Sequence, residues 1–315
     1  MRLYGAAMIR NEADIVEAFV RHNLTVLDGL AIVDHGSCDG TSEVLASLAA
    51  EGLPIAVSSD ATPGLHQSAV TTRLVREVFL RNAADFVFVI DADEFIKVPS
   101  RRVLEAALST LAQHLHAVVH WQTYIPDFAA VPDDAGVRER IAVSRRLAQE
   151  SHGQYKVIVA RHLVDTPGAV LATGNHKVLA SNDTEALHQP NPHALLKPEV
   201  AAIAHVPVRS RAQFTAKIVI GWLAILAARL DHIGIAFHWR DVYEDLRAGR
   251  ELTADRLTEI AVNYSLARSE WRRSDAVARV ADPFLADFEL RYEHLGRREL
   301  LPILLAFAER LAAAR

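Results

Sequence analysis

The first half of the chain alternates short apolar runs with longer segments of helical periodicity. The runs Leu3–Ile9, Leu30–Val33, Ile55–Val57 and Phe86–Ile90 are rich in β-branched or aromatic residues and have the length of strands. Strands that are separated by helices pair in parallel, because the helix supplies the crossover connection that parallel pairing needs. The sequence therefore predicts an α/β fold with a mostly parallel central sheet flanked by helices.

Helical segments and further strands complete this pattern. A helix is predicted over Asn11–Leu27, with Asn11 as its N-cap and acidic residues in its first turn. Gly52 follows the next helix at the position where a left-handed residue commonly ends a helix. The other predicted elements are the helices Ser42–Ala50, Ser68–Ala84 and Ser100–His114 and the strands Ala117–Gln122 and Tyr155–Arg161.

The last third of the sequence has a different pattern. From Gln213 onward, Ala-, Leu- and Arg-rich stretches predict a nearly all-helical region. We therefore divide the protein into an α/β domain, residues 1–212, and a C-terminal α-helical region, residues 213–315, which is expected to contact the acceptor, a second copy or a membrane. The apolar segment Ile218–Leu230 is shorter than the roughly 20 residues that span a bilayer. It predicts a buried helix, with peripheral membrane contact as the alternative.

Composition excludes several classes of protein. With 50% hydrophobic and 23% charged residues, the protein has the composition of an ordinary globular protein. Its net charge of −5 provides no basic surplus for a nucleic-acid backbone, so nucleic acid is not an expected partner. The single cysteine, Cys38, excludes an intrachain disulfide. The N-terminus has no secretory signal pattern, and a cytoplasmic location is expected.

Acidic residues follow the predicted strands at the points where the strands end. Ligands of an open parallel sheet bind at the carboxyl ends of its strands, so these residues are the first functional candidates. In sequence order they are Arg10-Asn11-Glu12, Asp34-His35, Ser58-Ser59-Asp60 and Asp91-Ala92-Asp93-Glu94. Carboxylates gathered at one edge repel one another, which indicates compensation by a cation, by sugar hydroxyls or by the N–H groups of a base.

The pair Asp91 and Asp93 has the spacing of a metal site. Residues two apart in an extended segment point to the same side, so both carboxylates can face one ion. Hard oxygen ligands suit Mg²⁺ or Mn²⁺, which complete their shells with water and with phosphate oxygens of the substrate. The alternative is a solvated turn, but the preceding buried strand Phe86–Ile90 favours the functional interpretation.

Three motifs together resemble the N-terminal half of family 2 glycosyltransferases, and most closely the branch with an N-terminal Arg/Lys-Asn-Glu motif. They are Met8–Glu17 (MIRNEADIVE), Ile32–Thr41 (IVDHGSCDGT) and Ile90–Phe95 (IDADEF), in that order. The resemblance covers roughly residues 1 to 215. It implies a GT-A fold, a nucleotide-sugar donor, for which a UDP-sugar is favoured, a divalent metal (Mn²⁺ or Mg²⁺) and an inverting transfer to an unknown acceptor.

The same resemblance assigns roles to individual residues. Asp93 would ligate the metal, Asp91 would face the ribose or the metal, and Glu94 would reach the donor sugar or finish the turn. Arg73 or Arg76 would approach the donor from the helix before the acidic strand, and the alternative for both is surface solvation. The base and ribose of the donor would lie near Arg10, Asn11, Glu12, Asp34 and Asp60, and Asp39 would either bind the donor or cap a helix.

Later segments supply histidines and basic residues that resemble motifs of the same branch. In Thr173–Lys177 and Ala204–Ser210, His205 is favoured as a metal ligand and His176 comes next, because a neutral imidazole can join carboxylates around a metal. The alternative is a structural histidine. Charge-assisted contacts with the diphosphate are expected from Lys156, Arg209 and Lys217.

The residue that removes the acceptor proton is not apparent, since the Glu-Asp base motif of the family is missing. The candidates are Asp127, Asp183 and Glu185. On the strand before Pro126, His120, Trp121 and Tyr124 are either core aromatics or a platform on which a sugar stacks. Two other functions stay open: an inactive sugar-nucleotide-binding or interaction protein, and a metal-dependent nucleotidyltransferase, although the latter lacks its Gly-rich loop.

Overall fold

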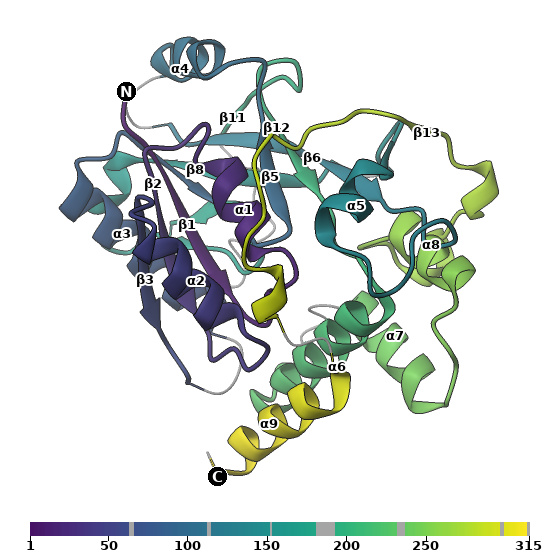
Figure 1. Cartoon of the computed structure of the whole chain (residues 1–315). Coiled ribbons are helices and arrows are strands. Elements are labelled where there is room, and N and C mark those ends of the chain that lie inside the picture. Colours follow the sequence, from purple (N-terminus) through teal and green to yellow (C-terminus); the bar gives the residue numbers. More distant parts are fainter. Residues whose placement is uncertain are drawn as a thin grey trace.

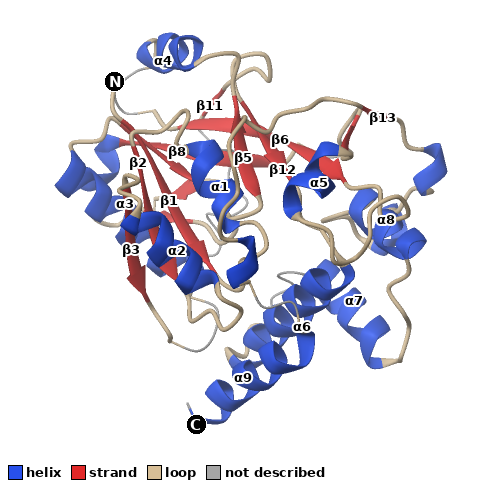
Figure 2. Ribbon diagram, in the orientation of Figure 1, coloured by secondary structure: helices blue, strands red, loops and turns tan. Residues whose placement is uncertain are grey.

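The computed structural model describes residues 1–62, 66–111, 115–151, 153–180, 193–231, 237–296 and 299–313. The central sheet (Figure 2) includes the strands β1 (Leu3–Ile9), β2 (Gly29–Asp34), β3 (Ile55–Ser59), β4 (Phe86–Val89), β5 (Glu94–Lys97), β6 (Ala117–Ile125), β7 (Arg145–Leu147), β8 (Tyr155–Ala160), β11 (Ala194–Leu195), β12 (Ala202–His205) and β13 (Arg279–Val280). A separate ribbon pairs β9 (Val170–Leu171) with β10 (Val178–Leu179).

The strand order is β13-β7-β6-β8-β4-β1-β2-β3, with β11 and β12 also paired to β6, and β5 paired to β12. Parallel pairing joins β1 to β2, β1 to β4 and β2 to β3, whereas β8 runs antiparallel to β4 and to β6. The carboxyl ends of β1, β2, β3 and β4 therefore meet at one edge of the sheet. The predicted fold class, α/β with a mostly parallel central sheet flanked by helices, is confirmed.

Helices cover both faces of the parallel part of the sheet (Figure 1). One face packs against α1 (Val16–Asn23), α2 (Thr41–Ala50) and α4 (Arg101–Ser109), whose apolar side chains share a core cluster with β1 and β2. The other face packs against α3 (Gln67–Asn82). Strands buried from both sides need apolar residues throughout, which explains the uninterrupted apolar run of Phe86–Val89.

The first helix begins later than the sequence predicts. Asn11 is not its N-cap: α1 starts at Val16, and Asn11 has a φ of 55° in the loop that precedes it. Its side-chain oxygen instead accepts a hydrogen bond from the backbone N–H of Cys38 at 2.8 Å. An asparagine tolerates this left-handed conformation, and its amide stabilises the loop after β2. Gly52, with a φ of 82°, ends α2 as predicted.

The C-terminal region is helical, but not throughout. Its helices are α6 (Arg211–Ala227), α7 (Phe237–Arg247), α8 (Ala254–Val262) and α9 (Leu300–Ala313), and α6 packs against both α7 and α9. A short helix, α5 (Val137–Ala142), precedes them. Within the described residues, no helix is long and apolar enough to cross a membrane.

Residues 281–296, which we call the strap, contradict the prediction of a nearly all-helical C-terminal region. They run without an α-helix across the front of the α/β domain, as the yellow trace between β13 and α9 in Figure 1 shows. Phe284, Leu285 and Phe288 pack against the same core cluster as α1. Burial of these side chains favours the extended path.

Polar contacts tie the strap to the α/β domain as well. The carboxylate of Glu17 in α1 accepts backbone hydrogen bonds from Arg291 and Tyr292. At the other end of the strap, Asp282 forms ion pairs with Lys97 and Arg146, each at 2.5 Å. The boundary between residues 212 and 213 stays a prediction, and the residues after this boundary contribute to the packing of the α/β domain.

At Gly40 the backbone of the strap lies against the turn between β2 and α2. We expect Gly40→Ala to lower the free energy of unfolding by about 2–4 kcal/mol, since a left-handed non-glycine residue and an overpacked contact both destabilise. Gly40 has a φ of 101°, and a Cβ there would lie 2.2 Å from the carbonyl oxygen of Leu295. Urea unfolding measures the loss.

Gly52→Ala is the matched control for this prediction. Gly52 also has a positive φ, of 82°, but a Cβ there would meet nothing within 4 Å. Its substitution should cost only the backbone strain, about 1–2 kcal/mol. Equal losses for the two variants would show that the contact with Leu295 contributes nothing.

Candidate active site

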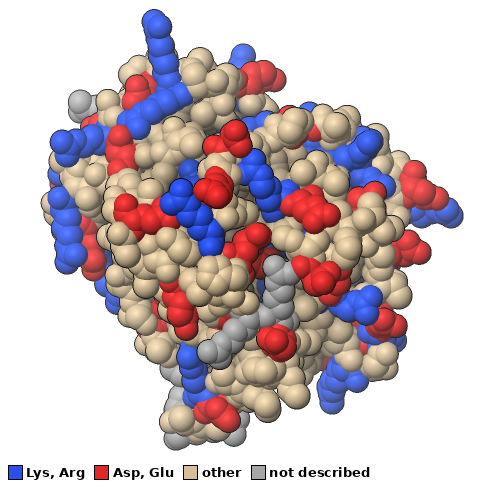
Figure 3. All heavy atoms as spheres, in the orientation of Figure 1, with Lys and Arg blue, Asp and Glu red and all other residues tan. Residues whose placement is uncertain are grey.

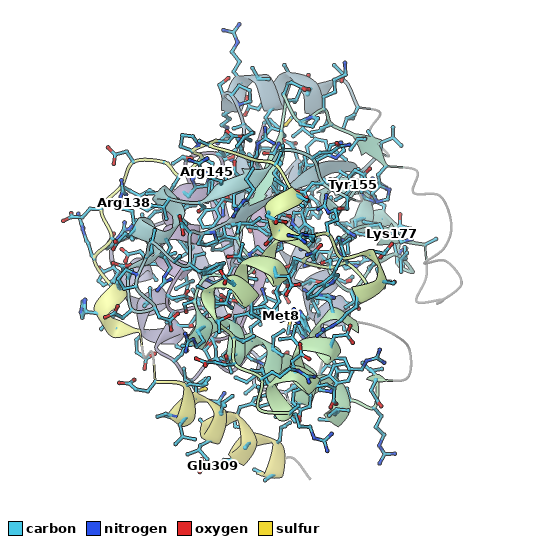
Figure 4. The ribbon with its side chains drawn as sticks, turned by 90° about the vertical axis from the view of Figure 1, so that its right-hand side faces the viewer. Met8, Arg138, Arg145, Tyr155, Lys177 and Glu309 are labelled. Carbon is cyan, nitrogen blue, oxygen red and sulfur yellow. The ribbon has the colours of Figure 1, made fainter. Side chains whose placement is uncertain are left out.

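A cavity of about 540 Å³ lies at the carboxyl ends of β1 and β4. The sheet side of the cavity is formed by residues after β1 and β4 and by side chains of β6, β8 and β12, and helix α6 lies on the opposite side. Met8, labelled near the centre of Figure 4, lines it together with Lys217, Ile220 and Ala224 of α6. The sheet and helix α6 therefore both line the cavity at the strand ends where the sequence predicts functional residues.

Asp91 and Asp93 both line this cavity, and each carries an ammonium partner. Asp91 Oδ2 lies 2.5 Å from Lys156 Nζ of β8, and Asp93 Oδ2 lies 2.5 Å from Lys217 Nζ of α6. Gln67 and Asn175 also donate to Asp91 Oδ1, each at 3.3 Å. The acidic strand end thus lies at the meeting point of separate parts of the protein.

Asp93 is almost completely buried and yet remains ionised. Burial alone would raise its pKa, but the positive charges of Lys217 and Arg209 hold the pKa below its usual range. His205 Nε2 lies 3.8 Å from Asp93 Oδ1, and Arg209 Nη1 lies 3.9 Å from Oδ2. A buried carboxylate surrounded by cations is a permanent negative charge at the cavity wall.

Glu94 is fully buried at the start of β5, and burial raises its pKa to about 8. Its Oε1 accepts a hydrogen bond from Trp121 Nε1 at 2.6 Å and lies 3.1 Å from Lys156 Nζ, while its Oε2 accepts from the backbone N–H of Asp91 at 2.9 Å. These contacts fix the turn between Asp91 and Glu94, and the predicted contact of Glu94 with the donor sugar stays a prediction.

Two histidines complete the wall next to Asp93. The ring of His205 stacks on Trp121 with a centroid separation of 3.9 Å and an interplanar angle of 6°, and burial lowers its pKa well below the usual value, so the ring is neutral. His176 Nδ1 contacts the carbonyl oxygen of Tyr155 at 2.7 Å. Trp121 is held by Glu94 and His205 and also lines the cavity, so its role as a platform for a sugar stays a prediction.

The residues around Asp93 fit a divalent cation in both donor type and charge. Ligand atoms of Asp93, Glu94 and His205 lie within 4.8 Å of one another, and His205 Nδ1 is buried without a hydrogen-bond partner among the described residues. Oxygen ligands with one neutral imidazole suit Mn²⁺. Of the ligands predicted from the sequence, this group contains Asp93 and His205. Asp91 and His176 lie outside it, and their metal roles stay predictions.

The ion pairs at the cavity wall are unbalanced in charge. On the surface shown in Figure 3, acidic and basic side chains are interspersed. Two neighbouring sets of ion pairs at the cavity wall, in contrast, together hold five carboxylates and three cationic side chains. One set pairs Asp91 and Glu94 with Lys156, and the other pairs Glu12, Asp14 and Asp93 with Arg209 and Lys217. Ionisation of all five leaves an excess of two negative charges, which one divalent cation balances. Burial raises the pKa values of Glu12 and Glu94 to about 7 and 8, and the neighbouring charge of Asp93 adds to both shifts.

Arg209 is the most deeply buried cation of these ion pairs, with a side chain that is 0% exposed. It lies 2.5 Å from Glu12 Oε2 and forms a forked contact with Asp14 at 2.7 and 2.8 Å. Arg209 follows β12, so this ion pair joins the end of one strand to the loop after β1. Arg209 therefore orients the Arg10–Glu12 motif, and its predicted contact with the diphosphate stays a prediction.

Arg10 and His35 lie side by side at the ends of β1 and β2 and both line the cavity. Arg10 Nε donates to the carbonyl oxygen of His35 at 2.7 Å, and its guanidinium lies 5.4 Å from the ring centroid of Phe307 in α9. Burial lowers the pKa of Arg10 to about 10 and that of His35 to about 4. Arg10, Asn11 and Glu12 all line the cavity, and their predicted contact with the base and ribose of the donor stays a prediction.

The acids after β2 and β3 are engaged in turns. Asp34 accepts hydrogen bonds from the Ser37 backbone and the Ser42 hydroxyl. Asp39 accepts hydrogen bonds from the Ala13 N–H and the Thr41 hydroxyl, and Asp60 accepts one from the Thr62 N–H and forms a loose ion pair with Arg73 at 3.4 Å. None of Asp34, Asp39, Asp60 and Arg73 is among the described residues that line the cavity, and their donor-binding roles stay predictions.

Of the three candidate bases, only Asp127 is among the described residues, and it does not line the cavity. Asp127 is exposed, accepts hydrogen bonds from the backbone of Ala129 and Ala130, and lines a different cavity. Asp183 and Glu185 lie outside the described residues. Nothing in the sequence pointed to Trp239 and Tyr264, which line the cavity from the C-terminal region. A spacing motif cannot find such residues, because only the tertiary fold brings them to the strand ends.

No protein-family model matches the sequence, and no curated protein matches it. Solved structures do match. Similar structures include S. aureus TarS 1-349, with 12% identity and a TM-score of 0.38 over 72% of this protein and 66% of that one. A mannosyltransferase from Pyrobaculum calidifontis, PcManGT, in complex with GDP-Man and Mn²⁺, matches with 15% identity and a TM-score of 0.40 over 99% of this protein and 86% of that one.

A third similar structure is glucosyl-3-phosphoglycerate synthase from Mycobacterium tuberculosis, in complex with Mn²⁺, UDP and glucosyl-3-phosphoglycerate. It has 17% identity and a TM-score of 0.27 over 38% of this protein and 44% of that one. The match thus spans less than two thirds of the length of this synthase and of TarS 1-349. Identities and TM-scores this low leave the function to be argued from the protein's own residues.

Proposed function

We propose that the protein is a glycosyltransferase of the GT-A type, similar to family 2, which transfers a sugar from a nucleotide diphosphate sugar to an acceptor with the help of Mn²⁺ or Mg²⁺. One observation carries the proposal: Asp91 and Asp93 face a cavity at the strand ends, and in the ion pairs at this wall five carboxylates face three cationic side chains. A cavity of about 540 Å³ is of the size that binds small molecules.

The cationic side chains of the cavity suit a diphosphate leaving group. Lys156 and Lys217 extend from opposite sides, β8 and α6, toward the two aspartates. Ammonium groups fixed in a buried site stabilise negative charge that develops in a transition state more strongly than in water. When bound, the divalent cation would supply further Lewis-acid stabilisation of the diphosphate. The described residues thus provide lysines for the diphosphate and aspartates for the metal.

We further propose that the transfer inverts the sugar configuration and that a UDP-sugar is the donor, both because the motifs resemble family 2. An inverting transfer needs a group that takes the proton of the acceptor hydroxyl. Since Asp127 lines another cavity, Asp183 and Glu185 are the candidates that remain for this role. The acceptor binds in the part of the cavity that the C-terminal region lines, where Trp239 and Tyr264 lie.

A thermal-shift panel of UDP, GDP and their sugars, each with and without Mn²⁺, tests the proposal. A ligand that binds only the folded protein stabilises it by RT ln(1 + [L]/Kd), about 2.7 kcal/mol at 100 times Kd. We expect a metal-dependent shift for at least one nucleotide and release of that nucleotide from its sugar conjugate. Absence of any shift would contradict the assignment, and a shift without turnover would indicate an inactive sugar-nucleotide-binding protein.

A further inference from the structure

Each aspartate of the Asp91–Asp93 pair already has an ammonium ion at contact distance, but the two lysines are held very differently. Lys156 is 1% exposed, contacts both Asp91 and Glu94, and lies 5.6 Å from the ring centroid of Trp121. These three contacts enclose its ammonium group. Lys156 is therefore a fixed part of the wall.

Lys217 is held more loosely and comes from outside the sheet. Its side chain is 18% exposed and lines the cavity, and its only carboxylate partner at contact distance among the described residues is Asp93, at 2.5 Å. Its other contacts are the carbonyl oxygen of Pro207 at 3.5 Å and the face of Tyr264 at 5.7 Å. A lysine side chain on a helix has several rotatable bonds, so Lys217 can exchange one anionic partner for another.

Lys217 and a divalent cation compete for the same carboxylate. Lys217 contacts Asp93 Oδ2. The same carboxylate belongs, with Glu94 and His205, to the group of ligand atoms that fits a metal ion. Two cations at one carboxylate in a buried site repel each other strongly, because the local dielectric constant is low. Arg209 Nη1, 3.9 Å from the same Oδ2, adds to this repulsion. A cation that binds at Asp93 must therefore displace the Lys217 ammonium.

The displaced ammonium needs a new anion, because an unpaired charge at a mostly enclosed wall is costly. Among the described residues that line the cavity, the carboxylates are Glu12, Asp91 and Asp93. Arg209 pairs with Glu12 and Lys156 pairs with Asp91, so neither is an open partner. A diphosphate in the cavity would provide the missing anion. Lys217 would form an ion pair with this diphosphate when the divalent cation binds to Asp93.

We propose that Lys217 couples the binding of the divalent cation to the binding of the nucleotide diphosphate. Lys217 stays paired with Asp93 until the diphosphate is present. This inference rests on the proposed function and deepens it. The cation binds weakly to the protein alone and tightly to its nucleotide complex. By thermodynamic reciprocity, the nucleotide gains the same factor of affinity from the cation. This effect on metal affinity is separate from the contact with the leaving group that is proposed for Lys217 above.

Titration of the 315-residue protein with Mn²⁺, followed by the electron paramagnetic resonance signal of free Mn²⁺, tests the coupling directly. The titration is done without nucleotide and with saturating UDP, or GDP if the thermal-shift panel selects it. For the unmodified protein we expect UDP to increase the Mn²⁺ affinity at least tenfold. For Lys217→Met, the affinity without UDP should rise by about tenfold and the increase due to UDP should largely disappear.

Two further variants make the result specific. Lys97→Met removes another lysine that contacts a carboxylate at 2.5 Å, that of Asp282, but Lys97 does not line the described cavity. It should leave both Mn²⁺ affinities unchanged. Lys217→Arg keeps the positive charge and should keep the coupling. Circular dichroism shows whether each variant is folded, and Lys217→Gln replaces Lys217→Met if the latter is not.

The outcomes separate the inference from the proposed function. If neither UDP nor GDP binds the unmodified protein with Mn²⁺, the proposed function fails. If a nucleotide binds but leaves the Mn²⁺ affinity unchanged, the coupling is overturned while the function stands. The coupling by Lys217 is equally overturned if Lys217→Met behaves like the unmodified protein, or if Lys97→Met reproduces its effect.

Discussion

Replacement of Arg209 by leucine is expected to lower the free energy of unfolding by about 3–5 kcal/mol, the typical loss when one partner of a buried ion pair is removed. Arg209 is 0% exposed and contacts Glu12 and Asp14 at 2.5 to 2.8 Å. Without the guanidinium, these carboxylates and Asp93 are left next to one another in a poorly solvated site. Urea unfolding followed by circular dichroism measures the loss.

The loss of unfolding free energy in Arg209→Leu should depend on pH. Burial already raises the pKa of Glu12 to about 7, and Arg209 acts against that rise. Removal of Arg209 therefore raises the pKa further, and a carboxyl with a raised pKa destabilises the fold most when it is ionised. We expect a larger loss at pH 8 than at pH 5.5, where Glu12 is protonated at little cost. A loss that grows toward low pH would contradict this assignment.

Two variants serve as controls for Arg209. Arg211→Ala removes an arginine two residues away, which pairs with Glu251 at 2.8 Å on the surface, and this change should alter stability by less than about 0.5 kcal/mol. Arg209→Lys keeps the charge but not the forked geometry, so it should lose only part of the stability. If Arg209→Leu falls within about 1 kcal/mol of the unmodified protein, the ion pair does not hold the loop after β1.

Asp93→Asn is expected to abolish the metal-dependent part of the nucleotide-induced thermal shift. The asparagine has the same shape but neither the negative charge nor the anionic oxygen that faces Lys217 and His205. The excess charge that attracts a divalent cation is thereby halved. With ligand at 100 times Kd, a stabilisation of about 2.7 kcal/mol should fall to the value measured without Mn²⁺.

Asp127→Asn is the matched control for Asp93→Asn. Asp127 is an acid that the sequence nominates, but it lines another cavity and caps a turn through Ala129 and Ala130. The Asp127 variant should keep the full Mn²⁺-dependent shift. An unchanged shift in Asp93→Asn would overturn the metal role of Asp93, whatever the control shows.

The predictable part of the fold is the part in which local pattern and tertiary structure agree. Leu3–Ile9 is a strand as predicted, and the apolar run before Asp91 is a buried strand, because a segment covered on both faces must be apolar throughout. Asn11 shows the limit: it has the residue type of an N-cap, but its amide contacts Cys38 across the loop instead. The competing partner lies 27 residues away and leaves no local trace in the sequence.

The strap shows the same limit for a longer segment. The apolar residues Phe284, Leu285 and Phe288 fit a helical periodicity, yet they lie in an extended segment against the α/β core. Helix propensity is a weak preference, worth less than about 1 kcal/mol per residue, and burial of one large apolar side chain exceeds it. Only the position of the core surface decides between the two.

The sequence by itself determined where the negative charges of the site lie, since Asp91 and Asp93 follow a strand whose carboxyl end must face the ligand side of a parallel sheet. Tertiary structure alone decided which cations meet them. Lys156, Arg209 and Lys217 come from β8, the end of β12 and α6, and they are separated from Asp93 by 63 to 124 residues. A strand fixes the direction of its own side chains, whereas electrostatic balance depends on whichever segments fold against it.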